Sequence, residues 1–222
     1  MILCLWGHPD TAFLLMLLSA VCDFSDGLAA RLLDARSDLG RELDSLSDEI
    51  CFGLLPSVMM VQLMRNGGNA LWLCMLPLIL AVFSALRLGR FNLDERQHES
   101  FIGLPTPAAA MICGSMAWFV TRHPESLLAQ WASRPVFLPA VAILLSSLLV
   151  CRIPMFAMKL GTGHEADFLT KAKRTAFLTI AAIEAVLVVC LRRDWSLIVL
   201  LVFLTYIVLN LLFAVFPSTR RP

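Results

Sequence analysis

The sequence has little charge, and the charge it has shows no bias towards one sign. Only 16% of its 222 residues are Asp, Glu, Lys or Arg, and the formal net charge is +1. The chain thus lacks the basic excess that marks nucleic-acid-binding proteins, and that class is excluded. It also has no low-complexity tail and no polar stretch long enough to form a soluble domain.

Paired cysteines are missing as well. The seven cysteines stand singly inside apolar segments, with no C-x-x-C pair and no nearby histidine that could complete a metal site. We interpret them as small hydrophobic core residues, so a zinc-binding or disulfide framework is excluded.

Long hydrophobic runs, by contrast, dominate the chain. Hydrophobic residues make up 59% of it and the mean hydropathy is +0.78, whereas a soluble domain is only about half apolar. We therefore predict an all-α integral membrane protein, a polytopic transmembrane helical bundle that forms a single domain over residues 1–222. A spanning helix needs about 20 mostly apolar residues. Seven spans are predicted, near residues 11–33, 43–64, 70–87, 105–121, 136–153, 175–191 and 195–216.

The first residues and the distribution of basic residues predict the topology. Because "MILCLW" resembles the end of an apolar segment, we expect a further helix to precede Met1, which would make eight spans. Thirteen Lys and Arg residues lie after the first, third and fifth spans or at the C-terminus, against five on the other side. Cytoplasmic loops carry such an excess, so the richer side is predicted to face the cytoplasm.

The segment from residue 21 to residue 50 is unusual for a membrane chain, because it holds six aspartates and two glutamates. At 100° per residue, eight of its residues fall on two helical faces. The first face holds Asp23, Asp26, Gly27, Ala30 and Arg31, and the second holds Gly40, Asp44 and Asp48. Two helices joined by a short turn could therefore point four carboxylates into one cleft.

The cost of these acids indicates a bound cation. An Asp near the centre of a spanning helix costs roughly 2.5–3.5 kcal/mol on insertion scales. One arginine cannot neutralise four carboxylates, whereas one or two hard divalent ions with oxygen ligands can, and such ions also bind substrate phosphates. Gly27 and Ala30 leave room for a bulky ligand against the helix backbone. The remaining acids of the segment are interpreted as solvated: Asp34, Asp38, Glu42 and Glu49.

The eight residues resemble, at every position and spacing, the signature of the CDP-alcohol phosphatidyltransferases, D-x2-D-G-x2-A-R-x8-G-x3-D-x3-D over residues 23–48. This resemblance implies a membrane helical bundle, typically a homodimer. It also implies the transfer of a phosphatidyl or related phosphate group from a CDP-linked donor to an alcohol, with Mg²⁺ or Mn²⁺ as cofactor.

The resemblance also implies a role for each signature residue. Asp23, Asp26 and Asp44 would ligate metal, and Asp48 would be a further ligand or the base that deprotonates the attacking hydroxyl. The CDP-binding residues would be Gly27, Ala30, Arg31 and Gly40, with the small residues lining the nucleotide site and Arg31 holding charged groups.

Three segments resemble the bacterial membrane-type phosphatidylserine synthases: "ELDSLSDEICFGLLPS" at 42–57, "ALRLGRFN" at 85–92 and "FIGLPTPAAA" at 101–110. This likeness implies CDP-diacylglycerol and L-serine as substrates and the bacterial inner membrane as the location. The distribution of Lys and Arg predicts that the acidic segment opens on the cytoplasmic side. Arg87 and Arg90 share a helical face and suit either the serine carboxylate or a lipid phosphate. Membrane anchoring explains them equally well, and Asn92 is a weaker candidate.

Other interpretations stay open at this stage. A related transferase could use glycerol phosphate or inositol as acceptor, and the reaction could be a direct displacement or pass through an intermediate. An ion or proton transporter would also place carboxylates in the membrane, although the sequence holds no second copy of the acidic pattern.

Glu184, in the middle of the sixth predicted span, is expected to pair across a helix contact. For "GLPTP", a helix-entry role of Pro105 and Pro107 is sufficient.

Overall fold

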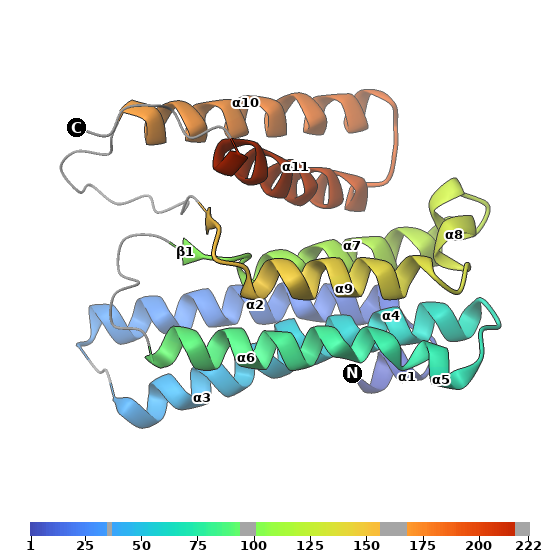
Figure 1. The fold of residues 1–222 in the computed structure, drawn as a ribbon, viewed down its shortest axis with the longest axis horizontal. Helices are drawn as coiled ribbons and strands as arrows, with labels where there is room; N and C mark the ends of the chain where they lie inside the picture. The colour runs from blue at the N-terminus through green and yellow to red at the C-terminus, as the bar shows by residue number, and fades with distance from the viewer. Residues whose placement is uncertain (35–36, 94–100, 156–167, 216–222) are drawn as a thin grey trace.

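The computed structural model describes residues 1–34, 37–93, 101–155 and 168–215, which form a bundle of helices (Figure 1). The helices are α1 (Ile2–Leu5), α2 (Pro9–Leu32), α3 (Asp38–Asp48), the π-helix η1 (Glu49–Leu54), α4 (Leu55–Asn66), α5 (Leu71–Cys74), the 3₁₀ turn η2 (Leu76–Leu78), α6 (Ile79–Leu93), α7 (Thr106–Arg122), α8 (Leu127–Ala132), α9 (Phe137–Val150), α10 (Phe168–Cys190) and α11 (Ser196–Val215). The described part has one further feature, a short antiparallel pair of β1 (Phe101–Ile102) with β2 (Pro154–Met155). The predicted all-α class is thus confirmed, apart from this pair.

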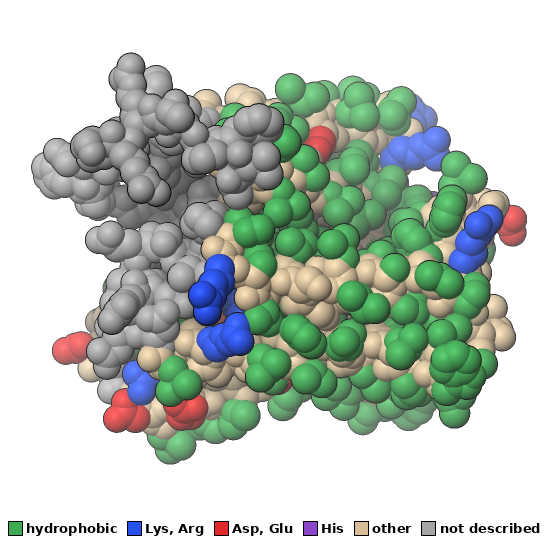
Figure 2. Space-filling view, in the orientation of Figure 1, with side chains coloured by type: hydrophobic (Ala, Val, Ile, Leu, Met, Phe, Trp, Pro, Cys, Tyr) green, Lys and Arg blue, Asp and Glu red, His purple; other side chains and the backbone are tan. Residues whose placement is uncertain are grey.

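Helices occur at all seven positions where spans were predicted. Four described stretches are long and apolar enough to cross a membrane: Pro9–Leu32, Asp38–Asn66, Leu71–Leu93 and Ser196–Phe213. α9 and the stretch Thr175–Cys190 are shorter apolar helices. The chain is therefore a membrane protein, and Figure 2 shows hydrophobic side chains over most of the described surface on one face.

The orientation prediction rests partly on residues that lie outside the described ones. These are Arg36, Arg96, Lys159, Arg220 and Arg221, and the side chains of Lys171, Lys173 and Arg174 are not described either. The side of the membrane on which the acidic segment lies stays a prediction.

Local sequence signals place the ends of α2 and α3. Pro9 begins α2, where its missing N–H costs nothing. Ser37 caps α3, because its hydroxyl accepts a hydrogen bond from the Gly40 N–H at 3.0 Å. Since α3 begins at Asp38, five residues before the predicted span, Gly40 lies in the same helix as Asp44 and Asp48.

A π-helical turn interrupts the long helix that α3, η1 and α4 form together. Pro56 stands at the start of α4 and has no N–H for the carbonyl four residues earlier, which favours a wider turn at this point. Gly53 leaves space inside the turn, because a Cβ there would lie 2.5 Å from a carboxylate oxygen of Glu49. The turn separates α3, which has no buried residue, from α4, where every residue from Leu55 to Met64 is buried.

α7 is the central helix of the bundle and packs against α2, α4 and α11. It approaches α2 closely at Gly114, where a Cβ would lie 2.2 Å from the ring of Phe13. The segment before α7 is anchored on the end of α9: Gly103 N–H donates to the Ile153 carbonyl at 3.0 Å and Leu104 N–H to the Leu148 carbonyl at 2.9 Å. Gly103 has a φ of 79°, a conformation that favours glycine.

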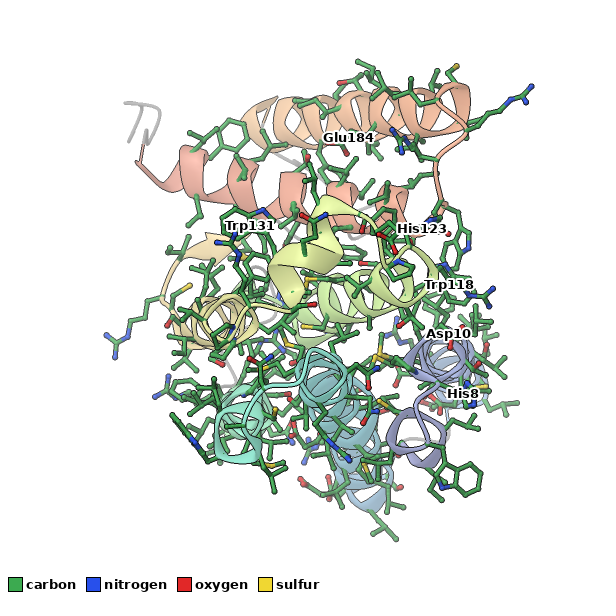
Figure 3. The ribbon with its side chains drawn as sticks, turned by 90° about the vertical axis from the view of Figure 1, so that its right-hand side faces the viewer. His8, Asp10, Trp118, His123, Trp131 and Glu184 are labelled. Carbon is green, nitrogen blue, oxygen red and sulfur yellow. The ribbon has the colours of Figure 1, made fainter. Side chains whose placement is uncertain are left out.

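Polar side chains join the helices at the end opposite the acidic segment. Arg122 of α7 forms an ion pair with the buried Asp10 of α2, with 3.0 Å between Nε and Oδ2. Asp194, before α11, accepts a hydrogen bond from Trp118 Nε1 at 3.1 Å and lies 3.2 Å from His123 Nε2. Figure 3 looks at this end and shows Asp10, Trp118 and His123 along one edge of the molecule. These contacts fix α2, α7 and α11 relative to one another.

The carboxyl of Asp194 is held ionised by its neighbours. Burial opposes ionisation, but hydrogen bonds from Ser196, His123 and Trp118 outweigh it and hold the pKa of Asp194 below its usual value. Because the pKa is lower in the folded protein, the ionised carboxylate stabilises the folded state at pH values above the pKa that Asp194 has in the unfolded chain. This stabilisation is lost as the pH falls below that value and through the pKa of the folded state.

We predict that the stability advantage of the wild type over Asp194→Asn is constant near neutral pH and shrinks as the pH falls below about 4, near the unfolded pKa of Asp. The measurement is thermal unfolding of both proteins in detergent across a pH series. A difference that stays the same down to about pH 2 would contradict the assignment.

Candidate functional site

Three carboxylates, two from α2 and one from α3, lie close together. One carboxylate oxygen from each of Asp23, Asp26 and Asp44 lies within 4.8 Å of the other two. Asp23 is half-buried, and the other two are exposed. Like charges at this spacing repel one another unless a cation or a proton lies between them. Three hard oxygen donors facing one another fit a divalent cation such as Mg²⁺ or Mn²⁺.

Asp48 lies one helical turn beyond Asp44 and faces the same group. It interacts electrostatically with Asp23 and Asp44, and its side chain is within hydrogen-bonding reach of Asp23. Its Oδ1 atom is buried and has no hydrogen-bond partner among the described residues. The structure therefore brings together all four carboxylates of the signature, and we call Asp23, Asp26, Asp44 and Asp48 the acidic cluster.

The small signature residues differ in what surrounds them. A Cβ placed on Gly27 would meet no atom within 4 Å, so a ligand can approach the α2 backbone beside the acidic cluster. Ala30 is half-buried, and Arg31 is exposed in the last turn of α2. Gly40 serves the cap of α3, since a Cβ there would lie 3.0 Å from the Ser37 hydroxyl. Their nucleotide-binding role stays a prediction.

Arg87 brings a guanidinium from α6 to the acidic cluster. Its charge interacts with Asp48 and with Tyr206 of α11. Its Nη1 donates a hydrogen bond to Thr106 Oγ1 at 2.9 Å, whereas its Nε is buried and unpartnered within the described chain. Arg90, predicted on the same face, is exposed. The two arginines therefore differ in environment.

Asn92 links α6 to α3, because its Nδ2 donates to Ser45 Oγ at 2.9 Å, next to Asp44 in the sequence. Sequence reasoning did not single out Ser45, Thr106 or Tyr206. Ser45 and Thr106 lie inside the segments that resemble the phosphatidylserine synthases. Tyr206 is the chain's single tyrosine, and it lies in a span that carried only a hydropathy signal.

The predicted environments of the remaining acids were right in three cases and wrong in one. Asp34, Asp38 and Glu42 are exposed, as a solvated interpretation requires. Glu49 is half-buried, and one of its carboxylate oxygens is buried without a hydrogen-bond partner among the described residues. It was misassigned because the π-helical turn, which has no simple sequence period, carries it inwards.

Glu184 of α10 pairs across a helix contact, as predicted. The hydroxyl of Thr205 on α11 donates a hydrogen bond to its Oε1. This contact joins α10 to α11, which are far from the acidic cluster in the sequence. Helix packing is sufficient to explain it, and no catalytic role is needed.

Comparisons with known proteins extend this picture. Residues 1–138 match the family described as CDP-alcohol phosphatidyltransferase. Proteins named CDP-diacylglycerol–serine O-phosphatidyltransferase are similar to the chain: one from Mycobacterium tuberculosis (strain CDC 1551 / Oshkosh) is 33% identical over 190 residues, which cover 81% of this chain and 62% of that protein. One from Bacillus subtilis (strain 168) is 36% identical over 114 residues, covering 48% and 60%.

A third, from Methanocaldococcus jannaschii, is 38% identical over 101 residues, which cover 46% of this chain and 47% of that protein. The chain thus matches no more than 62% of the length of these relatives. The family match covers more than half of the chain and contains the whole acidic cluster. On these grounds the chain belongs to the CDP-alcohol phosphatidyltransferase family.

Proposed function

We propose that this protein transfers the phosphatidyl group of CDP-diacylglycerol to the hydroxyl of L-serine, releasing CMP. The observation that carries the proposal is the acidic cluster, which two consecutive helices of a CDP-alcohol phosphatidyltransferase assemble from the four signature aspartates. The names of the relatives support serine as the acceptor. Arg87, whose charge interacts with Asp48, would give an anionic end of the acceptor a cationic partner.

In the proposed reaction the serine hydroxyl oxygen bonds to the phosphorus that carries diacylglycerol. The bond between that phosphorus and the bridging oxygen of the diphosphate breaks, and CMP leaves with this oxygen. Asp48 takes the hydroxyl proton, and its buried Oδ1, which has no hydrogen-bond partner among the described residues, supports this role. A carboxylate is a weak base for a hydroxyl, so it accepts the proton late, as the new P–O bond forms.

The other signature residues hold the donor. Asp23, Asp26 and Asp44 would bind one or two Mg²⁺ or Mn²⁺ ions, with Asp48 as a possible further ligand. When bound, such ions neutralise the diphosphate and the charge that develops on the leaving CMP. Open space above Gly27 admits the nucleotide to the α2 backbone. Ala30 and Gly40 are proposed to line the same site, and the exposed Arg31 to hold a phosphate.

The acceptor site is proposed to lie between α3 and α6. The carboxylate of serine needs a cationic partner, and Arg87, whose charge interacts with Asp48, offers a buried Nε. Arg90, which is exposed, is better placed for a lipid phosphate. Asn92 contributes by holding α6 against α3 through Ser45.

The membrane arrangement is part of the proposal. We propose that α7, α9 and α10 cross the membrane in addition to the four longer stretches, giving seven spans in one domain over residues 1–222. At 1.5 Å per residue, the 17 residues of α7 reach about 26 Å, close to the thickness of the hydrocarbon core. The acidic cluster would face the cytoplasm at the bacterial inner membrane, in a homodimer.

An acceptor screen tests the proposed function. With CDP-diacylglycerol and Mn²⁺ or Mg²⁺, the purified protein should release CMP when L-serine is added and not without it. Glycerol 3-phosphate and inositol are the comparison acceptors. CMP release with either of these, and none with serine, would show a different acceptor, and ion flux in vesicles free of CDP-lipid would indicate a transporter.

Replacing the proposed base should abolish turnover. We expect Asp48→Asn to lower kcat by about 10²–10⁴-fold, because a positioned general base contributes on this order. Asp38→Asn is the matched control, since Asp38 is exposed at the other end of α3 and pairs only with Arg41 among the described residues. Thermal unfolding of both variants checks folding, and an Asp48→Asn protein with near wild-type kcat would remove the proposed base.

Removing the metal ligands should weaken cation binding directly. We expect each of Asp23→Asn, Asp26→Asn and Asp44→Asn to weaken Mn²⁺ binding, because a lost carboxylate removes one charge and one hard oxygen. Mn²⁺ titration followed by electron paramagnetic resonance, without substrate, measures this, and EDTA should abolish CMP release. Unchanged Mn²⁺ affinity in all three variants would show that the ion binds elsewhere.

A further inference from the structure

The guanidinium of Arg87 lies among residues of four helices. It comes from α6, and its Nη1 donates to Thr106 Oγ1 of α7 at 2.9 Å. It also interacts electrostatically with Asp48, at the end of α3, and with Tyr206 of α11. Thr106 is only 1% exposed, so its hydroxyl is a buried partner for a charged donor.

One edge of this guanidinium is still available. Nε of Arg87 is buried and makes no hydrogen bond to any described residue. A guanidinium is planar and carries its five N–H donors in a rigid fork. Fixing Nη1 therefore also restricts the direction of the Nε–H edge. A buried donor left without a partner is costly, and a carboxylate or phosphate oxygen of a ligand would satisfy it.

Thr106 is well placed to fix the arginine. It is the first residue of α7, directly after Pro105, whose φ is constrained. Gly103 and Leu104 anchor the same segment on the end of α9 through two backbone hydrogen bonds, of 3.0 Å and 2.9 Å. Helix entry explains the prolines of "GLPTP", but it does not explain a buried hydroxyl directed at an arginine.

We propose that Thr106 is a positioning residue that orients Arg87 towards the carboxylate of an amino-acid acceptor. This inference rests on the proposed function. Asp48 serves the hydroxyl end of the acceptor and Arg87 the carboxylate end, and the two side chains are close enough to interact. Thr106 selects for the acceptor carboxylate without touching the reacting atoms.

The test is a comparison of three threonine variants. Thr106→Val keeps the shape and removes the hydroxyl, Thr106→Ser keeps the hydroxyl, and Thr121→Val is the control at the far end of the same helix. The hydroxyl of Thr121 donates a hydrogen bond only to the Ala117 carbonyl in the described structure, at 2.8 Å.

We expect Thr106→Val to raise the KM for serine about tenfold, which is the effect of losing one hydrogen bond to a charged group. Its kcat and its KM for CDP-diacylglycerol should stay within about twofold, and Thr106→Ser should restore the KM for serine.

A ligand without the carboxylate isolates the proposed contact. L-Serinamide keeps the hydroxyl and the ammonium group and replaces the carboxylate by a neutral amide. The ratio of its inhibition constant to the KM for serine measures what the carboxylate contributes. We expect this ratio to fall in Thr106→Val and in Arg87→Lys, whose ammonium has no fork, and to be unchanged in Thr121→Val.

The outcomes separate this inference from the proposed function. If the wild type shows no serine-dependent CMP release, the proposed function itself fails. If the wild type is active and Thr106→Val changes only the KM for CDP-diacylglycerol, or changes neither KM, the positioning role is overturned. Should Thr106→Val not fold, an unchanged serinamide ratio in Arg87→Lys overturns it as well.

Discussion

The repulsion among the carboxylates of the acidic cluster is the constraint around which the site is arranged. Asp23, Asp26 and Asp44 place oxygens within 4.8 Å of one another, where two unit charges repel by on the order of 1–4 kcal/mol even with substantial screening. A chain without a cationic ligand would gain stability by turning these side chains apart. Two helices that hold them together, inside a membrane protein, instead provide binding energy for a divalent ion and, through it, for a diphosphate.

The bundle is organised so that this repulsion does not separate the helices. α7 packs against α2, α4 and α11, and the ion pair and hydrogen bonds around Arg122 and Asp194 join the opposite end. The stabilising polar contacts thus involve other residues than the destabilising acids, and α2 carries members of both groups. Burying Gly114 against Phe13 brings α2 and α7 into close contact between the two ends.

Much of the site could be predicted because its information is local. Asp44 and Asp48 are four residues apart, and helical geometry alone puts them on one face. The ion pair of Asp10 with Arg122 could not be found in this way, because 112 residues separate its partners. Similarly, the contact of Thr106 with Arg87 depends on how two helices pack. The number of spans could not be fixed from hydropathy, since α9 has only 14 residues.

Because of the π-helical turn between α3 and α4, one long helix has an exposed part and a buried part. Upstream of it the helix presents acids to a ligand, and downstream the same helix is enclosed by neighbours on all sides. Each extra residue in a helix rotates everything beyond it by about 100°. Converting Glu49–Leu54 to a regular helix would therefore rotate Asp44 and Asp48 away from α2 while α4 kept its packing. The chemistry could be lost through an altered helical phase with every reactive side chain still present.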